Sequence, residues 1–123
     1  MYCVQKMKSK SILVVDDKGI NRLLPGLILR PFGWTVLETD SGLDVLSVLK
    51  NSDVACVLLD IAMPDISGTD VLKNIRASSA FGGIKVIAYT AHATHDDTDQ
   101  LMGLGFDAVL IKPITSNQLL EIV

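Results

Sequence analysis

Ionisable or hydroxyl-bearing residues stand at the ends of four short apolar runs in this sequence. They are Asp16 and Asp17 after Ile12 to Val15, Asp60 after Val54 to Leu59, Thr90 after Ile84 to Ala88, and Lys112 after Phe106 to Ile111. Two carboxylates 4 Å apart repel by about 4 kcal/mol at an effective dielectric of 20, so a cation is expected among them. Mg²⁺ accepts a few carboxylates and leaves positions for phosphate oxygens. With a lysine and a hydroxyl nearby, the set predicts a site that handles phosphoryl groups by positioning and charge neutralisation.

The elements that position these residues follow from the alternation of apolar runs and amphipathic stretches. The apolar runs include Trp34 to Leu37 besides the four above, and three of them are almost continuously apolar. Such runs are typical of parallel strands covered on both faces. The order βαβαβαβαβα predicts an α/β fold, a doubly wound parallel sheet of (βα)₅ type. Because the carboxyl ends of parallel strands meet at one edge, the polar residues should converge there.

The helical stretches carry apolar residues at spacings of three and four. The expected stripes are Ile20, Leu23, Leu24, Leu27 and Ile28; Leu43, Val45, Leu46 and Leu49; Val71, Leu72 and Ile75; Leu101, Met102 and Leu104. Pro25 removes one hydrogen bond inside the first helix, so we expect that helix to be kinked or shortened. Thr115 followed by Gln118 predicts a capping box at the start of the last helix.

Composition and charge exclude several classes of protein. The chain has 123 residues, enough for one domain with its own core. Eleven basic and fourteen acidic residues give a net charge of −3, which argues against direct nucleic-acid binding. No apolar run approaches the roughly 18 residues that a membrane helix needs. The two cysteines, Cys3 and Cys56, suggest no disulfide framework, so we expect a cytoplasmic protein that does not bind membranes.

Taken together, these residues resemble the receiver domain of two-component response regulators over residues 10–123. The matching segments are Ile12 to Asp17, Leu58 to Gly68, Val86 to Ala91, and Lys112-Pro113. Asn21-Arg22 and the segment from Thr90 to residue 93 further resemble receivers attached to hybrid sensor kinases. The resemblance implies the flavodoxin-like strand order 2-1-3-4-5. We expect the receiver domain to span residues 11–123, after a flexible tail at residues 1–10.

The resemblance also implies a role for each matching residue. Asp60 would accept a phosphoryl group from the phosphohistidine of a histidine kinase or histidine phosphotransfer protein. Mg²⁺ would be held by Asp17, Asp60 and the main-chain carbonyl of Ala62, with Asp16 acting directly or through water. Lys112, Thr90 and the Ala91 amide would contact the phosphoryl group, and the Lys112-Pro113 bond would be cis. The domain would act as a phosphorylation-activated switch and not as a turnover enzyme. Its output partner is not indicated by the sequence, and a homodimer is a possible state.

Val109 departs from the family pattern, because many receivers carry an aromatic residue three positions before the lysine. One alternative is therefore a pseudo-receiver, an interaction module that is not regulated by phosphorylation. A second is an aspartyl-phosphate phosphatase, but that class needs an Asp where this chain has Ala62. A third, flavin binding, conflicts with the charge of Asp16-Asp17 after the first run.

Overall fold

The computed structural model, which describes residues 10–81, 83–91 and 94–123, contains one parallel sheet with the strand order β2-β1-β3-β4-β5. The strands are β1 (Ser11–Val15), β2 (Thr35–Thr39), β3 (Cys56–Asp60), β4 (Lys85–Thr90) and β5 (Ala108–Ile111). The predicted fold class and strand order are both confirmed. Because β1 and β3 are neighbours, the acids that follow or end them meet at one edge of the sheet.

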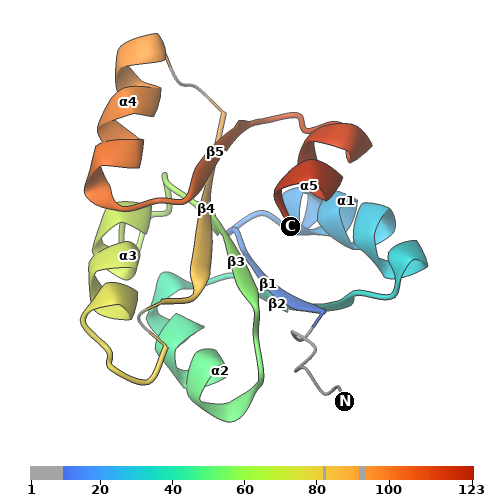
Figure 1. Ribbon diagram of the computed structural model, residues 1–123, viewed down its shortest axis with the longest axis horizontal. Helices are drawn as coiled ribbons and strands as arrows, with labels where there is room; N and C mark the ends of the chain where they lie inside the picture. Colours follow the sequence, from blue (N-terminus) through green and yellow to red (C-terminus); the bar gives the residue numbers. More distant parts are fainter. Residues whose placement is uncertain (1–9, 82, 92–93) are drawn as a thin grey trace, which may run out of the picture.

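The helices cover both faces of this sheet (Figure 1). They are α1 (Gly19–Leu29), α2 (Val45–Asn51), α3 (Gly68–Arg76), α4 (His95–Leu104) and α5 (Ser116–Ile122), with short 3₁₀ turns η1 (Arg30–Phe32) and η2 (Gly42–Asp44). Figure 1 shows α1 and α5 on one face and α2, α3 and α4 on the other. Each face therefore has its own apolar core, and successive strand residues contribute to the two cores in turn.

The continuously apolar strands are buried because helices pack on both faces of the sheet. All residues of β3 are buried, and in β1 and β4 only the first residue of each strand is not. Cys56 lies in this layer as a buried free thiol. A strand that packs helices on both faces has no position where a polar residue would meet water. The first polar positions are therefore at the strand ends, where the candidate site lies.

The helix starts agree well with the sequence. The capping box predicted at Thr115 and Gln118 is present, and a second one joins Thr94 and Asp97 at the start of α4. Gly105 ends α4 in the left-handed conformation, with φ of 115°. That conformation favours glycine because it has no Cβ.

Three expectations about the helices need correction. The expected shortening of α1 is wrong, because α1 continues as one helix through Pro25 to Leu29, with Pro25 and its neighbour Gly26 buried. The alternative effect of Pro25, a kink, stays a prediction. Leu43 does not join the stripe of α2, since it lies in η2 and is 68% exposed. The expected stripes of α1 and α4 are also partly exposed, at Ile20, Leu23, Leu27, Met102 and Leu104.

The structure bears on several other expectations. The Lys112-Pro113 peptide bond is cis, as the resemblance implies. Of the tail expected at residues 1–10, only Lys10 lies among the described residues, and residues 92 and 93 of the hybrid-kinase resemblance also fall outside them. Among the described residues, no helix has the length and apolar character needed to cross a membrane.

Candidate functional site

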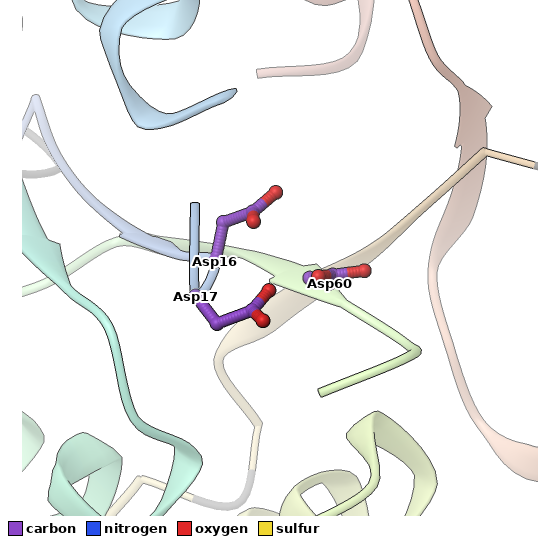
Figure 2. A group of neighbouring side chains, drawn as sticks. All are labelled: Asp16, Asp17 and Asp60. Carbon is purple, nitrogen blue, oxygen red and sulfur yellow. The ribbon is translucent and has the colours of Figure 1, made fainter. Parts of the chain in front are cut away.

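Three carboxylates gather at the carboxyl ends of β1 and β3. Each of Asp16, Asp17 and Asp60 offers one oxygen, and these oxygens all lie within 4.8 Å of one another. Figure 2 shows the side chains of Asp16 and Asp17 leaving the end of β1 beside that of Asp60. Asp16 is fully buried and Asp60 is 5% exposed, while the Asp17 side chain is 25% exposed. Of the three side chains, that of Asp17 is therefore the most exposed.

The strand geometry explains why these acids meet. Val15 pairs with Leu59 in the parallel ladder between β1 and β3, so the next residues along, Asp16 and Asp60, are neighbours as well. The amide of Asp16 donates to the Thr39 carbonyl at 3.2 Å, which extends the pairing of β1 with β2 by one residue. The Asp16 carboxylate then accepts a hydrogen bond at 2.9 Å from the amide of Lys18. This bond fixes the turn that leads into α1.

Lys112 supplies the positive charge that the carboxylates lack. Its ammonium lies 2.7 Å from Asp16 Oδ2 and 3.5 Å from Asp60 Oδ1. The lysine follows β5, and its amide donates to the Thr90 carbonyl at 2.7 Å, which ties it to the end of β4. Its side chain is 15% exposed, so the ion pairs are only weakly screened by solvent. The predicted convergence of Asp16, Asp60 and Lys112 is therefore present.

The electrostatic environment raises the pKa of Asp60 above its ordinary value of 3.8. Burial is the largest cause, and the neighbouring charge of Asp16 adds to it. Lys112 and a hydrogen bond from the Ala62 amide, at 3.2 Å from Asp60 Oδ1, act in the opposite direction. One ammonium does not fully compensate three acids, so the site favours a further cation.

The residues present fit a divalent cation at this cluster. Within the described part of the chain, Asp17 Oδ1 is a buried side-chain oxygen that has no hydrogen-bond partner. An unpaired buried carboxylate oxygen is costly unless something binds it. Hard oxygen donors without sulfur or imidazole are the ligands that Mg²⁺ prefers. Asp17 and Asp60, with Asp16 behind them, would hold that ion.

The other predicted site residues line a shared groove. Thr90, which is 9% exposed, and the exposed Ala91 border it together with Asp60, Ala62 and Lys112. The far wall is apolar and comes from α1, with Ile20, Leu23, Leu24 and Leu27. We call this feature the α1 groove. The structure thus brings Asp60, Thr90, Ala91, Lys112 and Ala62 to one opening.

Two residues near the site were missed by the sequence reasoning. Arg22 on α1 donates from Nη1 to the Asp16 carbonyl at 2.7 Å and from Nε to Glu38 at 3.2 Å. Tyr89 is 2% exposed and lies under the Lys112 ammonium, and burial raises the pKa of its phenol. The alternation of side chains along β4 could have indicated that Tyr89 is buried on the opposite face of the sheet from Thr90. A contact from a helix to a strand-end carbonyl, as at Arg22, leaves no such pattern.

Comparison with known proteins agrees with this site. The family model described as the response regulator receiver domain matches residues 12–123. The chain is 35% identical to the chemotaxis protein CheY-3 of Vibrio cholerae, over 93% of this chain and 88% of that protein. It is 30% identical to the polar-differentiation response regulator DivK of Brucella ovis, over 94% of each.

Solved structures show the same likeness. A CheY-like receiver domain protein from Methanospirillum hungatei aligns with a TM-score of 0.80 and 29% identity, over 92% of this chain and 89% of that one. The receiver domain of a sensor histidine kinase from Pseudomonas aeruginosa aligns with a TM-score of 0.82 and 25% identity, over 93% of each chain. The latter was solved with a magnesium ion coordinated in its active-site cleft.

The family model and the relatives thus place the chain in a class of phosphoacceptor domains rather than of classical enzymes. The chain belongs to the response regulator receiver domain family of two-component systems. Its acidic pocket of Asp16, Asp17 and Asp60 has the composition of the magnesium sites of such domains. Membership of the family implies a histidine kinase as the ultimate source of the phosphoryl group.

Proposed function

We propose that this domain is a switch in which Asp60 accepts a phosphoryl group in a Mg²⁺-dependent reaction. The observation that carries the proposal is the placement of the Lys112 ammonium 2.7 Å from Asp16 and 3.5 Å from Asp60. In the described part of the chain, the neighbouring Asp17 Oδ1 has no hydrogen-bond partner. Bound Mg²⁺ would neutralise charge on the phosphoryl oxygens and on the acids that hold it. Asp17, Asp60 and the Ala62 carbonyl would hold the ion, with Asp16 acting directly or through water.

In the proposed transfer, an oxygen of the Asp60 carboxylate forms a bond to phosphorus while the bond from phosphorus to the donor histidine nitrogen breaks. The imidazole leaves with the electron pair of that bond. Asp60 is suited to this role because it opens into the α1 groove while Asp16 is fully buried. Lys112, already 3.5 Å from Asp60, would pair with the incoming phosphoryl oxygens. Thr90 and the Ala91 amide, which border the same groove, would donate hydrogen bonds to them.

The new charge is what would change the conformation. Phosphorylation adds about −1.5 to −2 charges and three acceptor oxygens. These would draw Thr90 and Lys112 toward Asp60 and bias the ends of β4 and β5. Val109, which pairs with Ala88 in β4, is partly buried against the core beneath α2, α3 and α4. Its lack of an aromatic ring means that transmission would depend on the main chain after β4.

The proposed donor is a histidine kinase or a histidine phosphotransfer protein. The apolar wall of the α1 groove supports a donor that rests an apolar helix face beside Asp60, because Ile20 and Leu27 are 74% and 62% exposed. We further propose a cytoplasmic location, a domain that begins at residue 11, and no direct contact with nucleic acid or membrane. The switch would act on an output domain or protein that the sequence does not identify, and the domain would be able to form a homodimer.

Incubation with acetyl phosphate tests the proposal. We expect the intact mass to increase by one acid-labile phosphoryl group when Mg²⁺ is present and not when it is chelated. Asp60→Asn should abolish the gain. Asp53→Asn is the matched control, since Asp53 lines a hollow at the opposite edge of the sheet. Trp34 lines that same hollow, so mass is a better reporter of the site than tryptophan fluorescence. An unmodified wild-type protein would favour the pseudo-receiver alternative.

A further inference from the structure

The Lys112 ammonium lies over the face of an aromatic ring. Its Nζ is 4.7 Å from the centroid of Tyr89, within the distance at which a cation is attracted to a ring. Tyr89 is 2% exposed, and the Lys112 side chain is 15% exposed. Because both groups are largely removed from water, the attraction is stronger than it would be at the surface.

The strand pairing explains why the ring reaches the lysine. Tyr89 and Asp60 are directly paired in the parallel ladder between β4 and β3. Tyr89 belongs to the core beneath α1 and α5, and it lines the α1 groove together with Asp60 and Lys112. The ammonium therefore lies near the Asp16 carboxylate at 2.7 Å, the Asp60 carboxylate at 3.5 Å and the Tyr89 ring at 4.7 Å.

We propose that Tyr89 is a positioning residue that holds the Lys112 ammonium at the carboxylate edge, ready for the phosphoryl group on Asp60. The inference rests on the proposed function. Lysine has a flexible stem of four methylene groups, so its ammonium can take many positions at the groove opening. The buried ring favours the positions directly above it. Without the ring, the ammonium would be held by the carboxylates alone, and its most favourable partner would be Asp16, the closer one.

Two substitutions separate the ring from the rest of the side chain. Tyr89→Phe keeps the ring and removes the hydroxyl, whereas Tyr89→Leu keeps an apolar side chain and removes the ring. Ile87→Val is the matched packing control, because Ile87 is fully buried on the same strand and in the same core, two positions before Tyr89. Thermal melting of each variant confirms that it is folded.

The first readout is the NMR signal of the Lys112 ε-methylene group, assigned by its loss in Lys112→Arg. Ring current should shift it upfield of the other lysines in the wild type, in Tyr89→Phe and in Ile87→Val, but not in Tyr89→Leu. The second readout is the rate of Asp60 phosphorylation by acetyl phosphate at saturating Mg²⁺. Tyr89→Phe and Ile87→Val should stay within roughly twofold of the wild type, and Tyr89→Leu should be slower by roughly threefold to tenfold.

The proposal is overturned if the Lys112 signal is unshifted in the wild type, because the ring would then not hold the ammonium. It is also overturned if Tyr89→Phe or Ile87→Val slows phosphorylation as much as Tyr89→Leu does, since the hydroxyl or the packing would then be responsible. Failure of the wild type to accept a phosphoryl group would refute the proposed function instead, and the NMR comparison would still test the contact.

Discussion

At the scale of single residues, Lys112 allows three carboxylates to share one end of a sheet. It pairs directly with Asp16 and Asp60, while Asp17 Oδ1 has no hydrogen-bond partner among the residues that the structure describes. One ammonium among three acids leaves the charge at the site undercompensated. Burial raises the pKa of Asp60, and the neighbouring charge of Asp16 adds to that shift. Such a site destabilises the metal-free protein, and binding of a cation would relieve the repulsion among its carboxylates.

Asp60→Asn should therefore stabilise the metal-free protein at pH 7. The amide matches the carboxylate in size and removes one negative charge beside Asp16. We expect the melting temperature to rise by roughly a few degrees, corresponding to about 1 kcal/mol in a chain of this length. Mg²⁺ should raise the melting temperature of the wild type much more than that of the variant, because it binds the native site.

The pH dependence of this difference has a definite sign. Because the pKa of Asp60 is raised in the folded protein, protonation stabilises the fold, and that contribution is lost as the pH rises through the folded pKa. The gain in stability from Asp60→Asn should thus be small near pH 3.8, the ordinary pKa of an aspartate, and should grow as the pH rises toward neutrality. Melting curves of both proteins in EDTA at several pH values measure it. A variant less stable than the wild type at pH 7 would contradict the account.

At the scale of elements, the turn from β1 into α1 carries two of the three acids, and a side chain of α1 binds its main chain. Arg22 on α1 donates to the Asp16 carbonyl at 2.7 Å and also pairs with Glu38 of β2. The guanidinium thereby links α1, β2 and the acid-bearing turn. Its side chain is 21% exposed, so these charged hydrogen bonds are partly sheltered from water.

Arg22→Ala should loosen this turn and weaken Mg²⁺ binding roughly tenfold, the scale of outer contacts to a metal site. The free energy of unfolding should fall by about 1–2 kcal/mol. Isothermal titration with Mg²⁺ and urea unfolding measure the two effects. Arg30→Ala is the matched control: Arg30 pairs with the same Glu38, at 3.6 Å, and donates to the Val36 carbonyl at 3.3 Å, so both of these partners lie on β2. Equal losses of Mg²⁺ affinity in the two variants would contradict the role of Arg22.

The elements also show where sequence reasoning reaches its limit. Strands β1, β3 and β4 were predicted well because burial on both faces leaves them continuously apolar. The stripe of α1 was misjudged because a spacing of three and four residues does not say which apolar residues face the sheet. Ile20 and Leu27 belong to the predicted stripe, yet their side chains are exposed and line the α1 groove. The shortening expected at Pro25 does not occur, because α1 runs through that residue, which is buried. The sequence shows the local cost of a proline inside a helix but not the burial of its side chain.

At the scale of the whole molecule, the sheet separates a buried interior from one reactive edge. Cys56 illustrates the interior: it begins β3, and burial raises the pKa of its thiol from 9.0 to about 12. The folded protein therefore keeps the thiol neutral, while the unfolded chain ionises it above pH 9.0. Stability from this group is fully present below pH 9.0 and is lost as the pH rises toward 12.

Cys56→Ala should consequently flatten the alkaline loss of stability. Between pH 9 and 12 the wild type should lose up to about 1.4 kcal/mol per pH unit more than the variant does. Urea unfolding of both proteins at pH 8, 9 and 10 measures the difference, and groups common to both proteins cancel. If the free energy of unfolding fell equally with pH in the two proteins, Cys56 would ionise as readily in the folded protein as in the unfolded chain, which would contradict the prediction.

The site itself could be predicted only in outline. Asp16, Asp60 and Lys112 were expected together because the carboxyl ends of parallel strands share one edge. The closer pairing of Lys112 with Asp16 than with Asp60, the contact of Lys112 with Tyr89 and the contact of Arg22 with the Asp16 carbonyl were not expected. Such contacts depend on side-chain directions that packing sets, and residue type and spacing do not record them.

We propose that Asp60, and not Asp16 or Asp17, carries the phosphoryl group. The most direct measurement is to treat the domain with acetyl phosphate and Mg²⁺, reduce the acyl phosphate with borohydride, and locate the reduced residue by peptide mass spectrometry. We predict reduction at Asp60 alone, dependent on Mg²⁺. Reduction at Asp16 or Asp17, or a modification that persists in Asp60→Asn, would contradict the account.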